Sequence, residues 1–189
     1  KAILGHNLPM QGEILYLGEP IKNLNAQAMA RKVSVVLTDR ISPGNLTVRQ
    51  LVELGRIPFT NWVGTIAEED KKVIDSAIKG TKIGYIAEKK VAEISDGQLQ
   101  KTMIARALAQ DGELMILDEP TAHLDLVNRM EIMQLLREIA HSRGKAILVV
   151  THDLDIAVET ADEFWLMPCG GPLISGTPED LILSGKINQ

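Results

Sequence analysis

Short runs of consecutive apolar residues alternate with segments of helical periodicity in the second half of the chain. The runs at 114–117 and 146–150 are wholly apolar, which is typical of strands that helices cover on both faces of a parallel sheet. Helices are predicted at 96–109 and 126–141, and Gly144 is a typical stop for the second. This alternation predicts an α/β fold with a mostly parallel sheet.

The first half combines two predicted strands with a helical segment. Residues 12–18 lie between glycines and residues 33–37 are apolar and rich in valine, so both are predicted strands. Thr47 and Thr65 each begin a capping-box pattern that precedes helix-forming sequence, and Gly80 is placed to end the second helix. We therefore expect a helical sub-domain between a strand and the rest of the core.

The end of the chain is predicted to form a hairpin and a closing helix. The turn is expected at 170–172, between strands at 164–167 and 173–174. Thr177 and Pro178 then fit the cap and the first position of a short helix.

Composition narrows the function classes. The 189 residues are 45% hydrophobic and 24% charged, which is an ordinary globular balance and enough for one sizeable core. The net charge of −5 disfavours nucleic acid and anionic lipid as partners. No apolar run is long enough to span a membrane, the first residues lack the form of a secretory signal, and a single cysteine fits a reducing compartment. We expect a cytosolic protein.

Residues 94–98, Ile-Ser-Asp-Gly-Gln, begin the helix predicted at 96–109. Ser95 is a typical N-cap, and Gln98 three residues later completes a capping box. A helix N-terminus also attracts anions, and Gly97 lets backbone approach a ligand closely. On its own the segment favours a plain cap.

Polar residues stand where both apolar runs end. Asp118 and Glu119 follow the first run, at the end of a parallel strand where ligand crevices form. The alternative is a pair of carboxylates that merely leads into a turn at Pro120. His152 follows the second run, and a histidine there is by itself more often a polar loop residue. Asp125 precedes a predicted helix and fits an N-cap.

In this order the segments resemble the ABC-type ATPases. The segment 94–98 resembles the signature motif, and the apolar run that ends in Asp118 and Glu119 resembles the Walker B strand. Asp125 then falls in the D-loop and His152 in the switch-histidine loop. The resemblance implies an ABC-type P-loop NTPase core with a helical sub-domain, and it implies ATP and Mg²⁺ as cofactors.

The family assigns the catalytic and metal-binding roles to three residues. Glu119 would orient the water that attacks the γ-phosphate, and His152 would steady that water. Asp118 would hold Mg²⁺ through water.

The family also assigns nucleotide contacts. Ser95, Gly97 and Gln98 would face the γ-phosphate of a nucleotide held by the opposite subunit, and Asp125 would reach across the dimer. Thr38 takes the position of the Q-loop glutamine, which touches Mg²⁺ and reports nucleotide state to the membrane partner.

The chain departs from the family pattern at three places. It contains no G-x-x-x-x-G-K-[ST] phosphate loop, which would lie upstream of Lys1. Asp96 replaces the first glycine of the signature, and Thr38 replaces the glutamine. As given, the chain is expected to bind Mg-ATP weakly or not at all, because that loop supplies most of the phosphate contacts.

The resemblance divides the chain into three parts. Residues 1–46 would be a partial N-terminal piece of the ATPase core, residues 47–93 the helical sub-domain, and residues 94–189 the part that carries the signature, Walker B strand, D-loop and switch histidine.

Within the family, the segments 46–49, 54–58 and 62–64, followed by an acidic helix, resemble subunits that energise uptake of iron chelates, haem or cobalamin. Such a subunit forms a head-to-tail homodimer on two ATP molecules and docks on transmembrane permease subunits. It is cytoplasmic and peripheral on the inner face of the membrane, with an indirect membrane association and no nucleic-acid partner.

Two other functions stay open. A soluble ABC ATPase of DNA repair or translation is disfavoured by the acidic charge and by the absence of a long coiled coil or a second cassette. A non-catalytic docking module with the same fold is favoured by the missing phosphate loop, Thr38 and Asp96, and disfavoured by Glu119 and His152.

Overall fold

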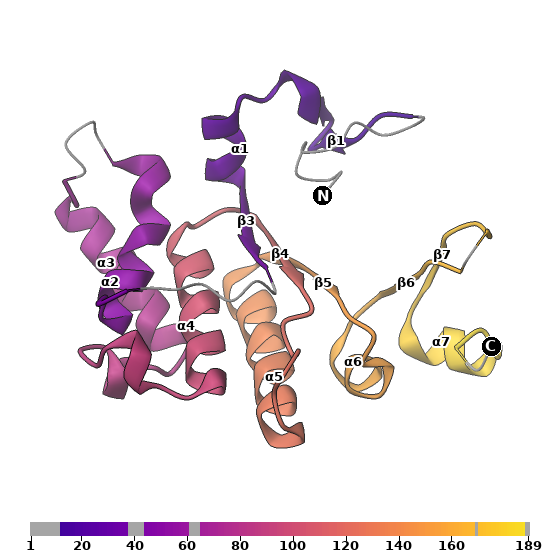
Figure 1. Cartoon of the computed structure of the whole chain (residues 1–189). Helices are drawn as coiled ribbons and strands as arrows, with labels where there is room; N and C mark the ends of the chain where they lie inside the picture. Colours follow the sequence, from indigo (N-terminus) through magenta and orange to yellow (C-terminus); the bar gives the residue numbers. More distant parts are fainter. Residues whose placement is uncertain (1–11, 38–43, 61–64, 169, 188–189) are drawn as a thin grey trace.

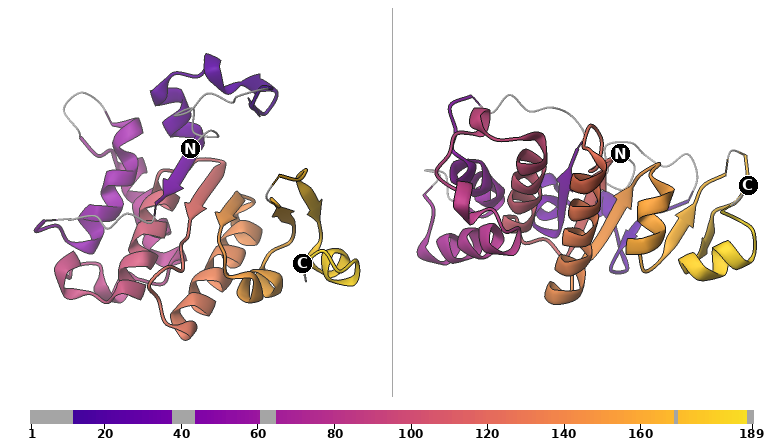
Figure 2. Two further views of the ribbon diagram at one scale, coloured as in Figure 1. Left: turned by 45° about the vertical axis from the view of Figure 1, so that its right-hand side comes forward. Right: turned by 90° about the horizontal axis from the view of Figure 1, so that it is seen from below.

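A computed structural model describes residues 12–37, 44–60, 65–168 and 170–187. The helical group α2–α3 lies at one end, a parallel sheet with α4 and α5 in the middle, and the C-terminal hairpin with α7 at the other end (Figures 1 and 2). The strands are β1 (Leu15–Tyr16), β2 (Glu19–Pro20), β3 (Val33–Val36), β4 (Leu114–Asp118), β5 (Ala146–Val150), β6 (Phe164–Leu166) and β7 (Ile174–Gly176). The α-helices are α1 (Ala26–Lys32), α2 (Val48–Glu53), α3 (Glu68–Gly80), α4 (Asp96–Ala109), α5 (Leu126–Arg143), α6 (Leu154–Thr160) and α7 (Pro178–Leu183). Short 3-10 helices are η2 (Ile21–Asn23), η3 (Leu54–Phe59), η4 (Gly84–Ile86) and η5 (Val91–Glu93).

The central sheet has the strand order β3-β4-β5, and all three strands are parallel. Leu117 of β4 pairs with Val36 of β3 and with Val149 of β5, and it is fully buried. The apolar run of β5 is only half-buried, because β5 pairs on one side alone within the described residues. The α/β fold with a parallel sheet and flanking helices is confirmed.

The predicted helical segment is present between β3 and α4. Helices α2 and α3 both pack on α4, and their apolar faces join one core with the central strand β4. Thr47 caps α2 as expected, because its side chain accepts the N–H of Gln50 while the Gln50 side chain accepts the N–H of Thr47.

Two predictions in the first half were wrong. Residues 12–18 do not form one strand: the backbone turns at Leu17 and Gly18, both with positive φ, so β1 pairs with β2 in a small antiparallel hairpin. Thr65 does not cap α3. The N-cap is Ala67, whose N–H donates to the Asp70 carboxylate at 3.2 Å.

The position of Asp70 explains where α3 begins. Its carboxylate accepts a 2.8 Å hydrogen bond from buried Arg56, so tertiary structure fixes the first turn. At the other end, Gly80 is the last residue of α3, but the chain reverses at Lys82, where φ is positive.

The C-terminal segment follows the sequence expectation. Strands β6 and β7 pair antiparallel, and Thr177 caps α7 with Pro178 at its first position. None of the helices in the described ranges is both long and apolar enough to cross a bilayer.

Candidate functional site

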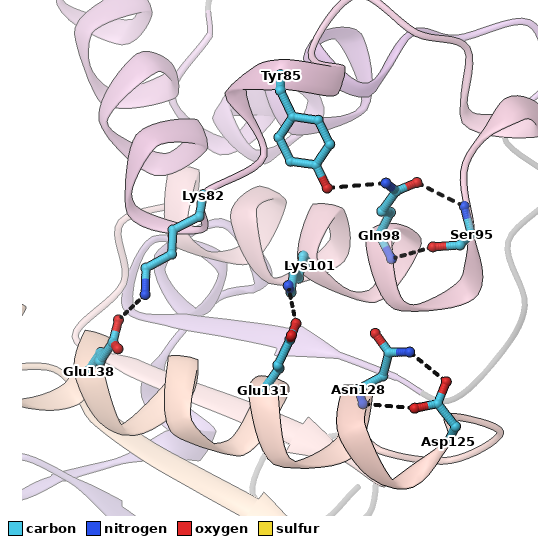
Figure 3. A network of polar contacts seen from close by, with 9 residues as sticks. All are labelled: Lys82, Tyr85, Ser95, Gln98, Lys101, Asp125, Asn128, Glu131 and Glu138. Carbon is cyan, nitrogen blue, oxygen red and sulfur yellow. Dashed lines mark hydrogen bonds and ion pairs between the residues drawn. The ribbon is translucent and has the colours of Figure 1, made fainter.

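The first group of candidate residues lies at the N-terminus of α4 (Figure 3). The Ser95 hydroxyl accepts the N–H of Gln98 at 3.3 Å, and the Gln98 side-chain oxygen accepts the N–H of Ser95 at 3.0 Å. The other end of the Gln98 amide donates to the hydroxyl of Tyr85 at 3.1 Å. The capping box is thus present, and Tyr85 fixes the orientation of the Gln98 side chain. Nothing in the sequence pattern indicated Tyr85.

Gly97 lies where α4 meets α5. A Cβ at Gly97 would come within 2.5 Å of the side-chain oxygen of Asn128, so only glycine permits this approach. Asn128 in turn donates to the Asp125 carboxylate from its side chain at 2.6 Å and from its backbone N–H at 2.9 Å. These two bonds lower the pKa of Asp125, the backbone N–H having the larger effect. The candidate residues of the signature and the D-loop therefore lie close together, where Gly97 of α4 meets Asn128 of α5.

Two ion pairs lie farther along α5, beyond Asn128 (Figure 3). Lys101 of α4 pairs with Glu131 at 2.7 Å, and Lys82 pairs with Glu138 at 2.7 Å. Lys101–Glu131 joins α4 to α5, and Lys82–Glu138 joins the turn after α3 to α5; most of these side chains are exposed, so each pair contributes little stability.

The second group lies at the carboxyl ends of β4 and β5. Asp118 is the last residue of β4, pairs in register with Val150 and is exposed. Glu119 follows, and its N–H donates to the carbonyl of Val150 at 2.8 Å. Its φ of 48° is unusual for a residue with a side chain and re-aims the chain at the end of the strand. Parallel pairing thus places Asp118 and Glu119 beside the loop that follows β5.

His152 and Glu119 are in direct contact. Nδ1 of His152 lies 2.9 Å from Oε1 of Glu119, and because an ionised carboxylate only accepts, Nδ1 carries the proton. This hydrogen bond and the charge of Glu119 raise the pKa of His152. The other oxygen, Oε2 of Glu119, is buried and has no hydrogen-bond partner among the described residues.

A third set of contacts holds the loop that carries His152. Arg129 of α5 donates to both carboxylate oxygens of Asp153, and Thr121 donates to Oδ2 of the same carboxylate at 3.2 Å. Nothing in the sequence pattern assigned a role to Asp153. No sequence motif indicated Arg129, because the residues that it contacts lie at the ends of other elements.

The structure does not join the two groups directly. In the part of the chain that it describes, no hydrogen bond or ion pair links Ser95, Gly97 or Gln98 to Glu119 or His152. Thr38, the candidate for the Q-loop position, lies outside the described residues. Asp96, which replaces a signature glycine, is the exposed first residue of α4, where a negative charge suits the helix dipole.

Comparison with known proteins identifies the family. The family model described as ABC transporter matches residues 1–122, about two thirds of the chain. The chain belongs to the ABC transporter family. An uncharacterised ABC transporter ATP-binding protein of Methanocaldococcus jannaschii is 38% identical over 100% of this chain and 65% of its own length. A probable siderophore transport system ATP-binding protein of Bacillus subtilis is 34% identical over 92% of this chain and 63% of its own length.

A solved structure of the ABC transporter family has the same fold. CbiO1 from Clostridium perfringens, part of an ABC transporter complex, superposes with a TM-score of 0.85 at 29% identity, over 98% of this chain and 74% of the other. The chain spans less than two thirds of the length of the two curated relatives. The resemblance read from the motifs is confirmed at the level of family and fold.

The arrangement at the strand ends of this ABC transporter chain has a clear chemical capacity. A carboxylate that keeps one oxygen without a partner in the described residues, while a histidine holds the other, can accept a hydrogen bond from a water molecule or take its proton. The N-terminus of α4 carries the partial positive charge of a helix start, which can attract an anion.

Proposed function

We propose that this chain is the ATP-hydrolysing part of a subunit that powers an ABC importer. The observation that carries the proposal is the state of Glu119, whose Oε1 contacts His152 while Oε2 is buried without a partner in the described residues. A buried acceptor left unsatisfied costs free energy, which suits a site built to receive a polar ligand.

Glu119 and His152 would share the work on the attacking water. Oε2 of Glu119 accepts a hydrogen bond from that water and takes its proton as the oxygen attacks the γ-phosphate. His152 keeps Oε1 occupied, so the carboxylate presents one defined oxygen. These are the catalytic residues of the proposal.

Asp118 fits the part of a magnesium-site residue. It is an exposed carboxylate at the end of the central strand, and Mg²⁺ takes oxygen ligands, often with waters between. Mg²⁺, when bound, would neutralise charge that develops on the phosphate oxygens. Asp118 would hold it through water, and Thr38 would be a further nucleotide contact.

The nucleotide is proposed to lie between two copies of the chain in a head-to-tail homodimer. Ser95, Gly97, Gln98 and Asp125 of one copy would face the phosphate that Glu119 and His152 of the other copy attack. The separation of these two groups within one chain supports this arrangement, since neither group contacts the other among the described residues.

The proposed role in transport rests on relatives. The Bacillus subtilis relative is named for siderophore transport, and the segment 54–58 resembles uptake subunits for iron chelates, haem or cobalamin. Transmembrane permease subunits would dock on the helical sub-domain, with the chain on the cytoplasmic face of the membrane. The division into parts 1–46, 47–93 and 94–189 belongs to the same proposal.

The substitution Glu119→Gln tests the function in the full-length protein. ATP turnover is expected to fall by about 10²- to 10⁴-fold, because the amide cannot take a proton, while ATP binding is retained. Glu138→Gln is the matched control, because Glu138 lies on the surface and pairs only with Lys82 in the described structure. A parent without ATP turnover would indicate a non-catalytic docking module instead, and equal measurable turnover in parent and Glu119→Gln would show that Glu119 is not the base.

A further inference from the structure

The loop that carries His152 is fastened to the first turn of α5 by one side chain. Nη1 of Arg129 donates to Oδ1 and Oδ2 of Asp153, each at 3.2 Å, and Nε of Arg129 donates to the carbonyl of Leu124 at 2.7 Å. Arg129 therefore contacts two loops, the one after β5 and the one between β4 and α5.

The surroundings of Asp153 make this contact more than a surface pair. Its side chain is 23% exposed, and that of Arg129 is 36% exposed. The hydroxyl of Thr121 donates to Oδ2 of Asp153 at 3.2 Å, and the Asp153 N–H donates to Thr151 at 3.0 Å. Charge-assisted bonds of partly buried groups are stronger than bonds between solvated ones.

The side chain of His152 itself has little packing to hold it. It is 79% exposed, so the 2.9 Å contact with Glu119 depends on where the backbone of residues 151–153 lies. Arg129 fixes that backbone through the next residue, Asp153. Arg129 thereby fixes the backbone of residues 151–153 relative to Leu124, which immediately precedes the D-loop candidate Asp125.

We propose that Arg129 is a positioning residue that holds His152 in contact with Glu119. Through Arg129, the position of His152 is coupled to the position of the segment 121–125. Its effect on turnover rests on the proposed function. In a dimer of the proposed kind, a shift of one copy's segment 121–125 on its partner would pass through Arg129 to the histidine of the same copy.

A double-mutant cycle in the full-length protein separates this role from simple stabilisation. Arg129→Gln is expected to lower kcat by about tenfold to a hundredfold, as a small misplacement of a catalytic group does, while KM for ATP changes little. In an His152→Ala background the same substitution should change kcat by less than about twofold, because Arg129 acts through His152. An equal loss of kcat in both backgrounds would overturn the proposal.

Two further variants sharpen the cycle. Arg129→Lys keeps the charge but cannot donate to Leu124 and Asp153 in the same way, so an intermediate loss is expected. Arg137→Gln is the control, because Arg137 also lies on α5 and bonds to the carbonyl of Glu159 at 3.3 Å, away from His152. It should leave kcat unchanged.

A measurement without ATP tests the role of Arg129 even if the protein shows no ATP turnover. In the parent, Glu119→Gln should shift the NMR signal of the His152 ring, because it replaces the group that contacts the ring. With Arg129→Gln or Asp153→Ala present, that shift should fall to less than half. A full shift in both folded variants overturns the inference, whereas a parent without ATP turnover contradicts only the proposed function.

Discussion

His152 and Glu119 form a 2.9 Å contact across the ends of the neighbouring parallel strands β5 and β4. The contact joins an imidazole, the side chain whose ordinary pKa lies closest to neutral, to a carboxylate that keeps its other oxygen buried. The pKa of His152 therefore depends directly on the presence of the Glu119 carboxylate.

The first prediction concerns the pKa of His152. The hydrogen bond to Glu119 raises it above its ordinary value of about 6.5, and Glu119→Gln should bring it back toward that value. Because the folded pKa is raised, the contribution to stability is fully present below the unfolded value and is lost as pH rises through the folded value. An NMR titration of the ring measures this. Glu138→Gln should leave the titration unchanged, and an unaltered pKa in Glu119→Gln would contradict the assignment.

The second prediction concerns the approach of α4 to α5. Gly97→Ala places a methyl group 2.5 Å from the Asn128 side-chain oxygen, so Asn128 must turn away and lose its bond to Asp125. We expect a loss of about 1–2 kcal/mol in the free energy of unfolding, measured by urea denaturation.

The matched background for that substitution is Asn128→Ala. There the new methyl group would meet the Cβ of residue 128 at 3.6 Å, which is an ordinary contact. Gly97→Ala should then be neutral or slightly stabilising, since alanine favours a helix over glycine. The same loss in both backgrounds would show that Asn128 does not set the requirement for glycine.

The third prediction compares two glycines of the helical segment. A Cβ at Gly55 would lie 2.2 Å from the carbonyl oxygen of Arg106, a backbone atom of α4 that cannot turn aside. Gly55→Ala should therefore push η3 away from α4 and cost about 3 kcal/mol or more. At Gly84 the nearest atom is 4.0 Å away, so Gly84→Ala should change stability by less than about 1 kcal/mol. Thermal unfolding of the two variants side by side checks the difference.

The elements that local sequence determines were predicted closely. Helix α4 begins after Ser95 and ends at Ala109, and β5 spans 146–150, because capping chemistry and an unbroken apolar run are properties of adjacent residues. The start of α3 was missed because a distant side chain, Arg56, holds the carboxylate that caps it. Tertiary contacts overrode a local pattern there.

The candidate site divides in the same way. Glu119 and His152 were singled out because the segments that end the two apolar strands resemble family motifs, and parallel pairing of those strands places the two side chains in contact. Arg129 and Tyr85 were not found, because each acts through a partner many residues away. Residues that support a motif from another element leave no mark in a single sequence, and their roles become visible only in three dimensions.

The last prediction concerns the buried ion pair of Arg56 and Asp70. Nε and Nη2 of Arg56 each lie 2.8 Å from Oδ1 of Asp70, Nη1 donates to the carbonyl of Ala109 at 2.9 Å, and the guanidinium stacks 4.0 Å from the ring centre of Phe59. Both charged side chains are about nine-tenths buried. Asp70→Ala leaves the guanidinium charged and unpaired, so we expect a loss of about 3–5 kcal/mol in the free energy of unfolding.

Replacing both partners tests whether the unpaired charge causes that loss. Arg56→Met with Asp70→Leu removes both charges and keeps apolar volume, so the double variant should be more stable than Asp70→Ala alone. Disruption of the exposed pair Lys82–Glu138 should change stability little by comparison. If the double variant is instead less stable than Asp70→Ala, the bond of Arg56 to the carbonyl of Ala109, which joins η3 to α4 and is lost only in the double variant, outweighs the cost of the unpaired charge.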